Sequence, residues 1–518
     1  MLETPSATHL RILKQVMKVS GVCLGVVNMG LMLVWPSVAF ADMQRDNSTI
    51  YGNSITLSDT QMDFVGSILP AGSLLGTLAG GHLVARIGRR GSMLWLTIPC
   101  VLAWVILAVS YNLATILIGR FVNGLYCGLV VVAGWAYAVE LPDIAVRGSL
   151  AAFPTLFLQL GYIIVLVSGL CLRWYQISFV GIGTSIISVV ALWFIPESPS
   201  YLIATGREDE ARRELRSLRG VHADIEDEIN DLRVKNSNLK SVSFFEILKI
   251  PDIRKTLIVL FVLFFIHNFC GMQIFTVNMT RIFRESGTLL GEAISSLIVF
   301  LTLLVGSTVS IFTINHIGRR NSMVISLSIL VVCLVMFGSY VHTTDSEKAA
   351  RAEEIKKNAS AMLTTHTIKV KNESNLVEYH PPHSKITSEI LNIVSTHERD
   401  ESTFKAKNET VMAKSWPRRH RWVPVICLLV FMAGASLGIT QVPFILNNEY
   451  FPTYIRAQAS SICLMASNLL NVLAVQLFTP MQVVLTPAGF YWFTAGICTL
   501  GVIFSFAFIV ETKDKAIG

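Results

Sequence analysis

The sequence contains little charge: 15% of its 518 residues are Asp, Glu, Lys or Arg, whereas 52% are hydrophobic. A soluble domain of this length cannot hide so large an apolar fraction in its core, so lipid must cover part of it. A soluble globular protein is therefore excluded, and we expect a membrane protein.

Polar loops that contain cysteine are also missing. The nine cysteines all lie within or at the ends of apolar runs: Cys23, Cys100, Cys127, Cys171, Cys270, Cys333, Cys427, Cys463 and Cys498. This distribution argues against a disulfide framework and against a Cys-ligated metal site. The sequence also has no Gly-rich phosphate loop, nucleophile arrangement or His/Asp/Glu metal cluster, so we expect no enzyme, no metal and no cofactor.

What the chain does have is about twelve apolar runs of roughly 20 residues, the length that a helix needs to cross a bilayer. The runs cover roughly 16–40, 62–84, 92–110, 115–139, 149–171, 175–195, 257–281, 289–312, 322–341, 423–447, 458–480 and 487–510. The first follows Arg11, Lys14 and Lys18 but has no A-x-A cleavage site, so it is interpreted as a retained span rather than a signal peptide.

The formal charge of +7 comes mainly from short loops on alternate sides of the expected membrane. A cytoplasmic N-terminus places one set of basic positions on the inner side: Arg86, Arg89, Arg90, Arg147, the stretch 207–255, Arg319, Arg320, Arg456 and Lys513. This is the positive-inside bias, so the charge indicates a bilayer and not a nucleic acid as partner. Both termini are expected in the cytoplasm, with the chain in the plasma membrane.

Glycosylation motifs agree with this orientation, because glycan is added only on the lumenal, later extracellular, face. The N-x-[ST] motifs at Asn47, Asn358, Asn372 and Asn408 all fall on the expected outer side. A fifth, at Asn278, lies inside an apolar run and is not expected to be modified.

Two polar segments interrupt the apolar pattern. Residues 342–422 are rich in Lys, Glu, Ser, Thr and His, and are expected to form a largely disordered, glycosylated outer loop. The inner segment 205–240 mixes acids and bases at helical spacing and predicts short surface helices. We therefore expect an N-terminal six-helix bundle over 1–199, a linker over 200–255 and a C-terminal six-helix bundle over 256–518.

An internal duplication supports the two halves. ARIGRR at 85–90 is answered by NHIGRR at 315–320, and ELPDIAVRG from Glu140 is answered by EYFPTYIRA from Glu449. The interval from Gly88 to Glu140 is 52 positions and that from Gly318 to Glu449 is 131, a difference of 79. That difference is close to the length of the polar loop, so the second half is the first half plus one insertion.

Four motifs carry a family resemblance: GGHLVARIGRR, GRFVNGLYCGLVVVAGWAYAVELPDIAVRG, PESPSYLIATGREDEA and VETKD. In this order the chain resembles the sugar-porter branch of the major facilitator superfamily, with insect trehalose carriers and solute carrier family 2 type sugar carriers as the nearest likeness. The resemblance implies an all-α membrane protein of about twelve transmembrane helices, in which two bundles rock around a central site.

The resemblance also implies a gate at the inner mouth, with acids that pair with the GRR arginines across the bundle interface. The implied gating residues are Arg89, Arg90, Glu140, Arg147, Arg319, Arg320, Glu449 and Arg456. Such pairs would bias a two-state equilibrium rather than perform chemistry. Ordinary solvated loop charge is the alternative. The sequence departs from the pattern at Ala85 and Asn315, where acids are expected, and at Ser200, where an arginine is expected.

Polar side chains inside the apolar runs are the candidates for binding substrate, because such groups are costly in lipid and tend to face a cavity. Matched to the family pattern, these are Gln159, His267, Asn268, Gln273, Phe444, Asn468 and Asn471. Leu303 stands where many members have asparagine. Hydrogen bonding between helices is the alternative for any one amide.

The first run has no acid or base after Lys18, and no run interior shows an Asp or Glu suited to carry a proton. This favours a uniporter over a proton symporter. We expect facilitative transport of a sugar, trehalose or a hexose, by a chain taken as a monomer. The alternatives are a carrier of a different polar metabolite and a transport-deficient sugar sensor.

Overall fold

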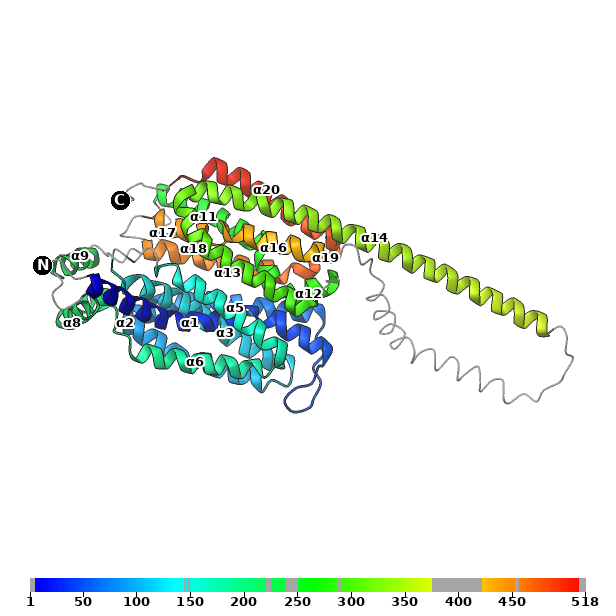
Figure 1. Ribbon diagram of the computed structural model, residues 1–518, viewed down its shortest axis with the longest axis horizontal. Helices are drawn as coiled ribbons and strands as arrows, with labels where there is room; N and C mark the ends of the chain where they lie inside the picture. Colours follow the sequence, from blue (N-terminus) through cyan, green and yellow to red (C-terminus); the bar gives the residue numbers. More distant parts are fainter. Residues whose placement is uncertain are drawn as a thin grey trace.

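The computed structural model describes residues 5–143, 146, 150–219, 225–237, 250–286, 290–374, 422–451 and 456–511. Over these residues the chain forms helices joined by turns (Figure 1). The helices of the first half and the linker are α1 (Pro5–Arg45), α2 (Asp59–Ala108), α3 (Leu113–Glu140), α5 (Phe153–Cys171), α6 (Ile177–Trp193), α7 (Pro199–Ala204), α8 (Glu208–Arg219) and α9 (Glu226–Ser237). Those of the second half are α11 (Pro251–Phe269), α12 (Met272–Ser286), α13 (Glu292–Ile317), α14 (Arg319–Ser374), α16 (Val423–Ser436), α17 (Val442–Glu449), α18 (Arg456–Gln476), α19 (Phe478–Leu485) and α20 (Pro487–Phe508).

The long helices run roughly parallel to the longest axis of the molecule (Figure 1). Helices α1–α6 lie on one side and α11–α20 on the other, and they are called the N-half and the C-half. Helices α8 and α9 lie at one end, the linker end. Helix α14 extends far beyond the opposite end, which is called the α14 end.

The expected spans are present as helices. In the described part of the chain, nine helical stretches are long and apolar enough to cross a membrane, and α6 and α16 are shorter apolar helices. Helix α2 covers two of the expected runs, 62–84 and 92–110. Gly88, with a φ of 83°, interrupts the helix between them. The all-α prediction of about twelve spans is confirmed.

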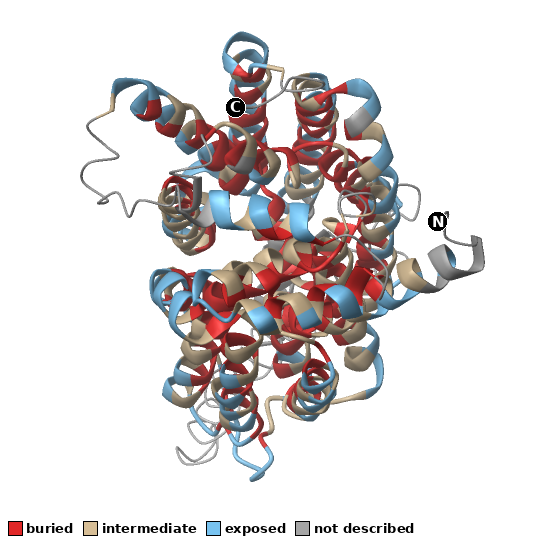
Figure 2. Cartoon of the chain, turned by 90° about the vertical axis from the view of Figure 1, so that its left-hand side faces the viewer, coloured by how far each residue is buried: buried red, intermediate tan, exposed pale blue. Residues whose placement is uncertain are grey.

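Burial is distributed as lipid requires. Buried residues gather inside the helix assembly, whereas outward faces are exposed (Figure 2). Large apolar side chains on these outward faces are among the most exposed, with Phe312 at 67% and Phe506 at 68%. Contiguous exposed apolar surface of this kind marks a membrane-facing belt.

Glycines allow close helix packing within the N-half. A Cβ atom at Gly124 of α3 would lie 2.1 Å from the carbonyl oxygen of Leu69 on α2. The same relationship holds between α5 and α1, where a Cβ at Gly161 would lie 2.2 Å from the oxygen of Val27. Backbones in direct contact are typical of membrane helix pairs, and they make the N-half a tightly packed unit.

The expectation of a disordered loop over 342–422 is wrong for its first part. Helix α14 continues without a break from the membrane span to Ser374, while 375–421 lie outside the described residues. The extension begins with many Ala, Glu and Lys residues, which are good helix formers. It also starts from a helix that is already formed, so no new nucleus is needed.

The expected glycosylation sites are placed as follows. Asn47 lies in the turn after α1 and is partly exposed. Asn358 and Asn372 lie on the extension of α14, and Asn408 lies outside the described residues. Their modification remains a prediction.

The linker forms the short helices that its charge pattern predicted. Helix α8 buries Leu215 and Leu218, and its last residue Arg219 donates to the carbonyl oxygen of Leu141 at 2.9 Å. Arg219 also pairs with Glu228 of α9 at 2.8 Å. The linker helices are therefore attached to the N-half at the end of α3.

Candidate functional site

A charged cluster lies at the linker end of the N-half. Arg89, directly after the Gly88 interruption, pairs with Glu140 at the end of α3 at 2.9 Å. Glu197 accepts the backbone N–H groups of Arg89 at 2.9 Å and Arg90 at 3.1 Å. A side chain at Gly88 would meet the Glu197 carboxylate, since an added Cβ would lie 2.3 Å from its oxygen.

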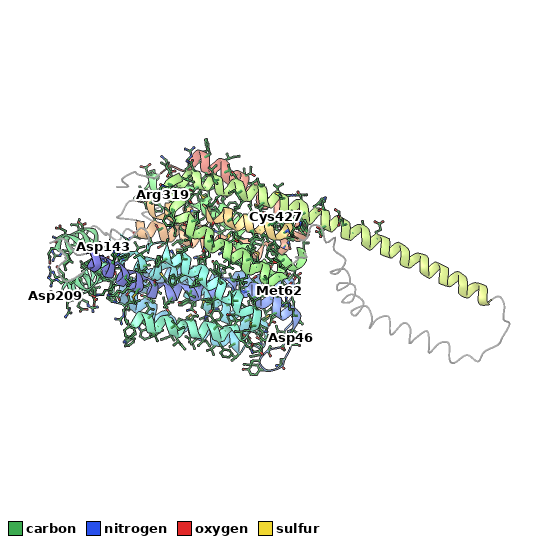
Figure 3. All side chains as sticks on the ribbon, in the orientation of Figure 1. Asp46, Met62, Asp143, Asp209, Arg319 and Cys427 are labelled. Carbon is green, nitrogen blue, oxygen red and sulfur yellow. The ribbon has the colours of Figure 1, made fainter. Side chains whose placement is uncertain are left out.

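The C-half repeats this cluster. Gly318 has a φ of 93°, and Arg319 pairs with Glu449 at 3.0 Å. Glu511 accepts the backbone N–H groups of Arg319 at 3.0 Å and Arg320 at 3.1 Å. Figure 3 shows Arg319 at the linker end, on the same end of the molecule as Asp143 and Asp209. The duplication seen in the sequence is thus a duplication of geometry.

One detail of the gate expectation is wrong. The pairs Arg89–Glu140 and Arg319–Glu449 each lie within one half rather than across the interface. In the N-half this follows from packing, because α2 and α3 are neighbours along their length. Arg147 lies outside the described residues; Arg456 begins α18, and nothing is described of its side chain.

The remaining two predicted gate arginines bind helix ends. Arg90 donates from Nε to the carbonyl oxygen of Leu192 at 3.1 Å, at the end of α6. Arg320 donates to the carbonyl oxygen of Phe506 near the end of α20, and its guanidinium lies 4.5 Å from the Phe506 ring centroid. A cation at a helix C-terminus is favourable because free carbonyl groups point at it.

Glu197 and Glu511 were not among the gating residues predicted from the sequence. Both hold the start of the helix that follows a glycine interruption, by accepting its free N–H groups. The signal was available, because each half ends its last span with a motif that contains a glutamate, PESP and VETKD.

In the middle of the molecule, polar side chains of the two halves meet. Gln159 of α5 donates from Nε2 to the hydroxyl of Ser307 on α13 at 2.7 Å. The buried Oε1 atom of Gln159 has no hydrogen-bond partner among the described residues. Gln441, at the start of α17, donates to the carbonyl oxygen of Ser307 at 3.5 Å. Ser307 and Gln441 were not among the predicted residues.

A second contact between halves involves Asn468 of α18. Its Oδ1 accepts from Ser73 at 3.4 Å and its Nδ2 donates to Thr77 at 3.3 Å, both on α2. Asn471, one turn further along α18, has a buried Oδ1 atom to which no described residue donates. An amide oxygen left open in this way is available to a ligand hydroxyl group.

The candidate residues of span 7, the seventh apolar run at 257–281, have different surroundings. Asn268 donates to the carbonyl oxygen of Phe264 within α11 at 2.8 Å and to the hydroxyl of Ser467 on α18 at 3.1 Å, and the second bond joins two helices. His267 and Gln273 face one another at 3.4 Å. Phe444 packs edge-on against His267 and remains 38% exposed.

The α14 end is closed by contacts between the halves. Ser37 and Thr280 hydrogen bond across the interface at 3.1 Å. Arg284 donates to the carbonyl oxygen of Ala41 at 3.2 Å, and Arg45 pairs with Glu292. These contacts join α1 to α12 and α13.

Helix α2 takes part in the same closure through an acid. Asp63 is 1% exposed, accepts the backbone N–H of Thr479 at 2.9 Å and lies 3.9 Å from Arg281. The expectation that no run interior contains an acid overlooked this residue, which is the second residue of the run 62–84. The acid is located at the end of its span, where the two halves touch.

A buried arginine was also missed. Arg120 of α3 is 1% exposed and donates to the carbonyl oxygens of Met32 and Val65, with its guanidinium 5.6 Å from the Trp35 ring centroid. Carbonyl oxygens and an aromatic face are the partners that allow a buried cation to stay in an apolar region.

No group of three or more His, Cys, Asp or Glu side chains suited to hold a metal ion occurs among the residues that the structure describes. The polar groups found at the middle of the molecule are amides, hydroxyls and one imidazole. Such a set recognises hydroxyl groups by donating and accepting hydrogen bonds.

Comparison with solved structures identifies the fold. A partially occluded inward-open conformation of the xylose transporter XylE from E. coli matches with a TM-score of 0.70 at 15% identity, over 97% of this chain and 100% of that one. The proton:xylose symporter XylE bound to 6-bromo-6-deoxy-D-glucose matches with a TM-score of 0.68 at 16% identity, over 97% and 98%. The protein therefore has the major facilitator fold.

The family is shown by sequence. The family model described as "Sugar (and other) transporter" matches residues 22–368 and 408–517, so the chain belongs to this family of non-enzymatic carriers. It is 23% identical to the facilitated trehalose transporter Tret1 of Drosophila willistoni, over 99% of this chain and 51% of that protein. It is 22% identical to Tret1 of Culex quinquefasciatus, over 97% and 84%. The chain spans about half the length of the Drosophila relatives.

Proposed function

We propose that the protein is a facilitative carrier that moves a sugar, trehalose or a hexose, down its gradient by alternating access. The observation that carries the proposal is the Gln159–Ser307 hydrogen bond of 2.7 Å, which joins the halves at the middle of the molecule. The bonded amide retains an open buried oxygen. A ligand hydroxyl at this point would contact both halves at once, and that is how binding can drive their movement.

The gates follow from the same geometry. The contacts of the α14 end hold the halves together there, whereas the pairs Arg89–Glu140 and Arg319–Glu449 of the linker end each lie within one half. We infer that the structure represents the state open toward the linker end, with that end in the cytoplasm and both termini on that side. The halves 1–199 and 256–518 then move relative to one another as units of a monomer in the plasma membrane.

The mode of transport is proposed to be uniport. The acids that the described interface places on spanning helices lie at span ends and face arginines: Asp59 and Asp63 near Arg281, and Glu292 near Arg45. Acids held by arginines at a span end suit structural ion pairs between the halves better than a proton path through the middle of the molecule. Uptake is then expected to be the same at acidic and neutral external pH.

The test is uptake of radiolabelled trehalose, glucose and fructose into oocytes at two pH values, beside the Gln159→Ala variant. Saturable uptake that does not depend on pH and is lost in the variant supports the proposal. Surface expression without flux of any of the three would reject it in favour of another polar metabolite or a sugar sensor. If uptake rises at acidic pH and becomes independent of pH in Asp63→Asn, uniport is rejected and the transport is coupled to protons.

A further inference from the structure

Two spans of the C-half are interrupted near the level of the proposed sugar site. Span 7 is broken between α11 and α12, and α12 carries Gln273. Span 10, the tenth apolar run at 423–447, is broken between α16 and α17. Residues 437–441 form this span-10 break. Helix α17 carries Glu449 of the linker-end cluster. The helix after the first break therefore carries a candidate sugar contact, and the helix after the second break carries a gate acid.

His267, near the end of α11, connects these breaks by a hydrogen bond whose direction is fixed. Its Nδ1 atom lies 2.9 Å from the carbonyl oxygen of Ile439 in the span-10 break. A carbonyl oxygen can only accept, so Nδ1 must carry the proton, and in the neutral ring Nε2 then presents a lone pair. Nε2 faces the amide nitrogen of Gln273 at 3.4 Å, which is therefore the donor. The bonds run from Gln273 to His267 to Ile439.

The imidazole ring is held in this orientation by its neighbours. It is 5% exposed and packs edge-on against Phe264, with centroids 6.4 Å apart, and against Phe444, with centroids 5.3 Å apart. Rotating the ring would displace one of these aromatic side chains. Both nitrogen atoms consequently point in fixed directions, toward one break each.

The span-10 break has a second support that does not reach Gln273. Ser326 of α14 donates to the carbonyl oxygen of Gly434 at 2.7 Å and accepts from the N–H of Ile439 at 3.1 Å. Ile439 is thus held on one side by Ser326 and on the other by His267. Among the contacts described for this break, the one through His267 leads to Gln273 on α12, whereas Gln441 contacts Ser307 of α13.

We propose that His267 is a positioning residue that transmits the state of Gln273 to the span-10 break, and through α17 to Glu449. A ligand group that takes the Gln273 N–H removes it from Nε2 of His267, which alters the bond from Nδ1 to Ile439 and with it the support of α17. This role rests on the proposed function for the identity of the ligand. It does not require His267 itself to touch the sugar.

The first test needs no ligand and measures amide hydrogen exchange of residues 437–441 in the detergent-purified full chain. His267→Phe keeps an aromatic ring between Phe264 and Phe444 but removes both hydrogen bonds. Exchange in the break should then rise about fivefold, the effect of losing one buried hydrogen bond. His267→Gln, which retains a donor and an acceptor, should restore slow exchange. Unchanged exchange in His267→Phe overturns the proposal.

The link to Gln273 is tested in the same way without a ligand. Gln273→Leu should speed exchange of the break in the wild-type background and have no further effect in the His267→Phe background. Equal effects in both backgrounds would show that Gln273 does not act through His267. Thr276→Val is the matched control on α12, because the Thr276 hydroxyl bonds only within its helix, to Met272, among the described contacts.

The last arm adds trehalose, glucose or fructose at saturating concentration. A sugar that binds should change exchange of 437–441 in the wild type and in Thr276→Val, but not in His267→Phe, even where the variant still binds it. An equal change in His267→Phe overturns the relay. If none of the three sugars binds the wild type, the proposed function fails while the two ligand-free tests still decide the role of His267.

Discussion

Asp63 of α2 and Arg281 of α12 face each other across the interface of the two halves, with 3.9 Å between Oδ1 and Nη1. Arg281 also contacts Asp59 at 3.4 Å, and its guanidinium lies 5.7 Å from the Phe478 ring centroid. Asp63 in turn holds the first turn of α19 through the N–H of Thr479. One acid therefore binds two separate helices of the opposite half.

Asp63→Asn should weaken closure of the α14 end. The amide keeps the size and can still accept from Thr479, but the charge opposite Arg281 is lost, so the open fraction should rise about fivefold for an effect of about 1 kcal/mol. Accessibility to a membrane-impermeant maleimide measures this with Val277→Cys, since Val277 packs against Gly66 of the other half. The background must carry Cys171→Ser, because that thiol is exposed.

Asp46→Asn is the matched control for this experiment. Asp46 lies at the α14 end (Figure 3) and pairs with Arg173, so its ion pair stays within the N-half. The hydrogen bond from Arg173 holds the pKa of Asp46 well below its usual range, so the pair is ionised throughout the experiment. Maleimide labelling equal to wild type is expected, and equal increases in both variants would show that the effect is not specific to the interface.

Glu197→Gln and Glu511→Gln should each lower thermal stability. Each glutamine loses charge-assisted bonds to the free N–H groups at a helix start, which is about 1 kcal/mol per site. The two acids belong to different halves, so the losses should add in the double variant. A thermal shift assay in detergent measures this. Glu210→Gln on α8, whose exposed pair with Arg207 contributes little, should leave the midpoint unchanged.

Ser307→Ala should reduce sugar affinity although Ser307 was not among the residues predicted from the sequence. It removes the hydroxyl that fixes Gln159, so the half-saturation concentration should rise about fivefold for one lost hydrogen bond. Gln159→Ala combined with Ser307→Ala should cost little more than Gln159→Ala alone, because the two side chains share one interaction. Dose-dependent uptake in oocytes gives all three values. Fully additive losses would mean that the two residues act separately.

Asn358→Gln and Asn372→Gln should each remove one glycan. Both asparagines lie on the extension of α14, where an acceptor outside the bilayer is accessible to the glycosylation machinery. A stepwise increase in gel mobility, abolished by prior treatment with peptide N-glycosidase, measures this. Asn278→Gln should cause no shift, because Asn278 is 1% exposed within α12.

The spans and the duplication could be predicted from the sequence because both depend on local patterns. Apolar length sets the spans, and the repeated GRR motifs set the two halves. The partners of those motifs could not be predicted in full, since the contact between Arg319 and Glu511 joins residues 192 positions apart. Asp63 was overlooked because its span begins one residue earlier, and a carboxylate near a span boundary looks like loop charge.

The middle of the molecule shows a different limit. The candidates Gln159 and Asn468 do contact the opposite half, but Asn268 bonds within the C-half. The sequence shows that an amide side chain lies in a span. Which neighbouring helix that side chain contacts depends on packing and on helix breaks. Ser307 and Gln441 could be identified only once α13 was placed beside α5 and the start of α17 beside α13.

Helix α14 also has a practical consequence for imaging. Its 56 residues correspond to about 84 Å at the usual helical rise, well over twice the thickness of the hydrocarbon core. A carrier of this fold normally presents little mass outside a detergent micelle, which makes particles hard to orient in electron micrographs. The part of α14 that projects from the bundle (Figure 1) belongs to one half only. It would therefore distinguish the two similar halves and mark the direction of each particle.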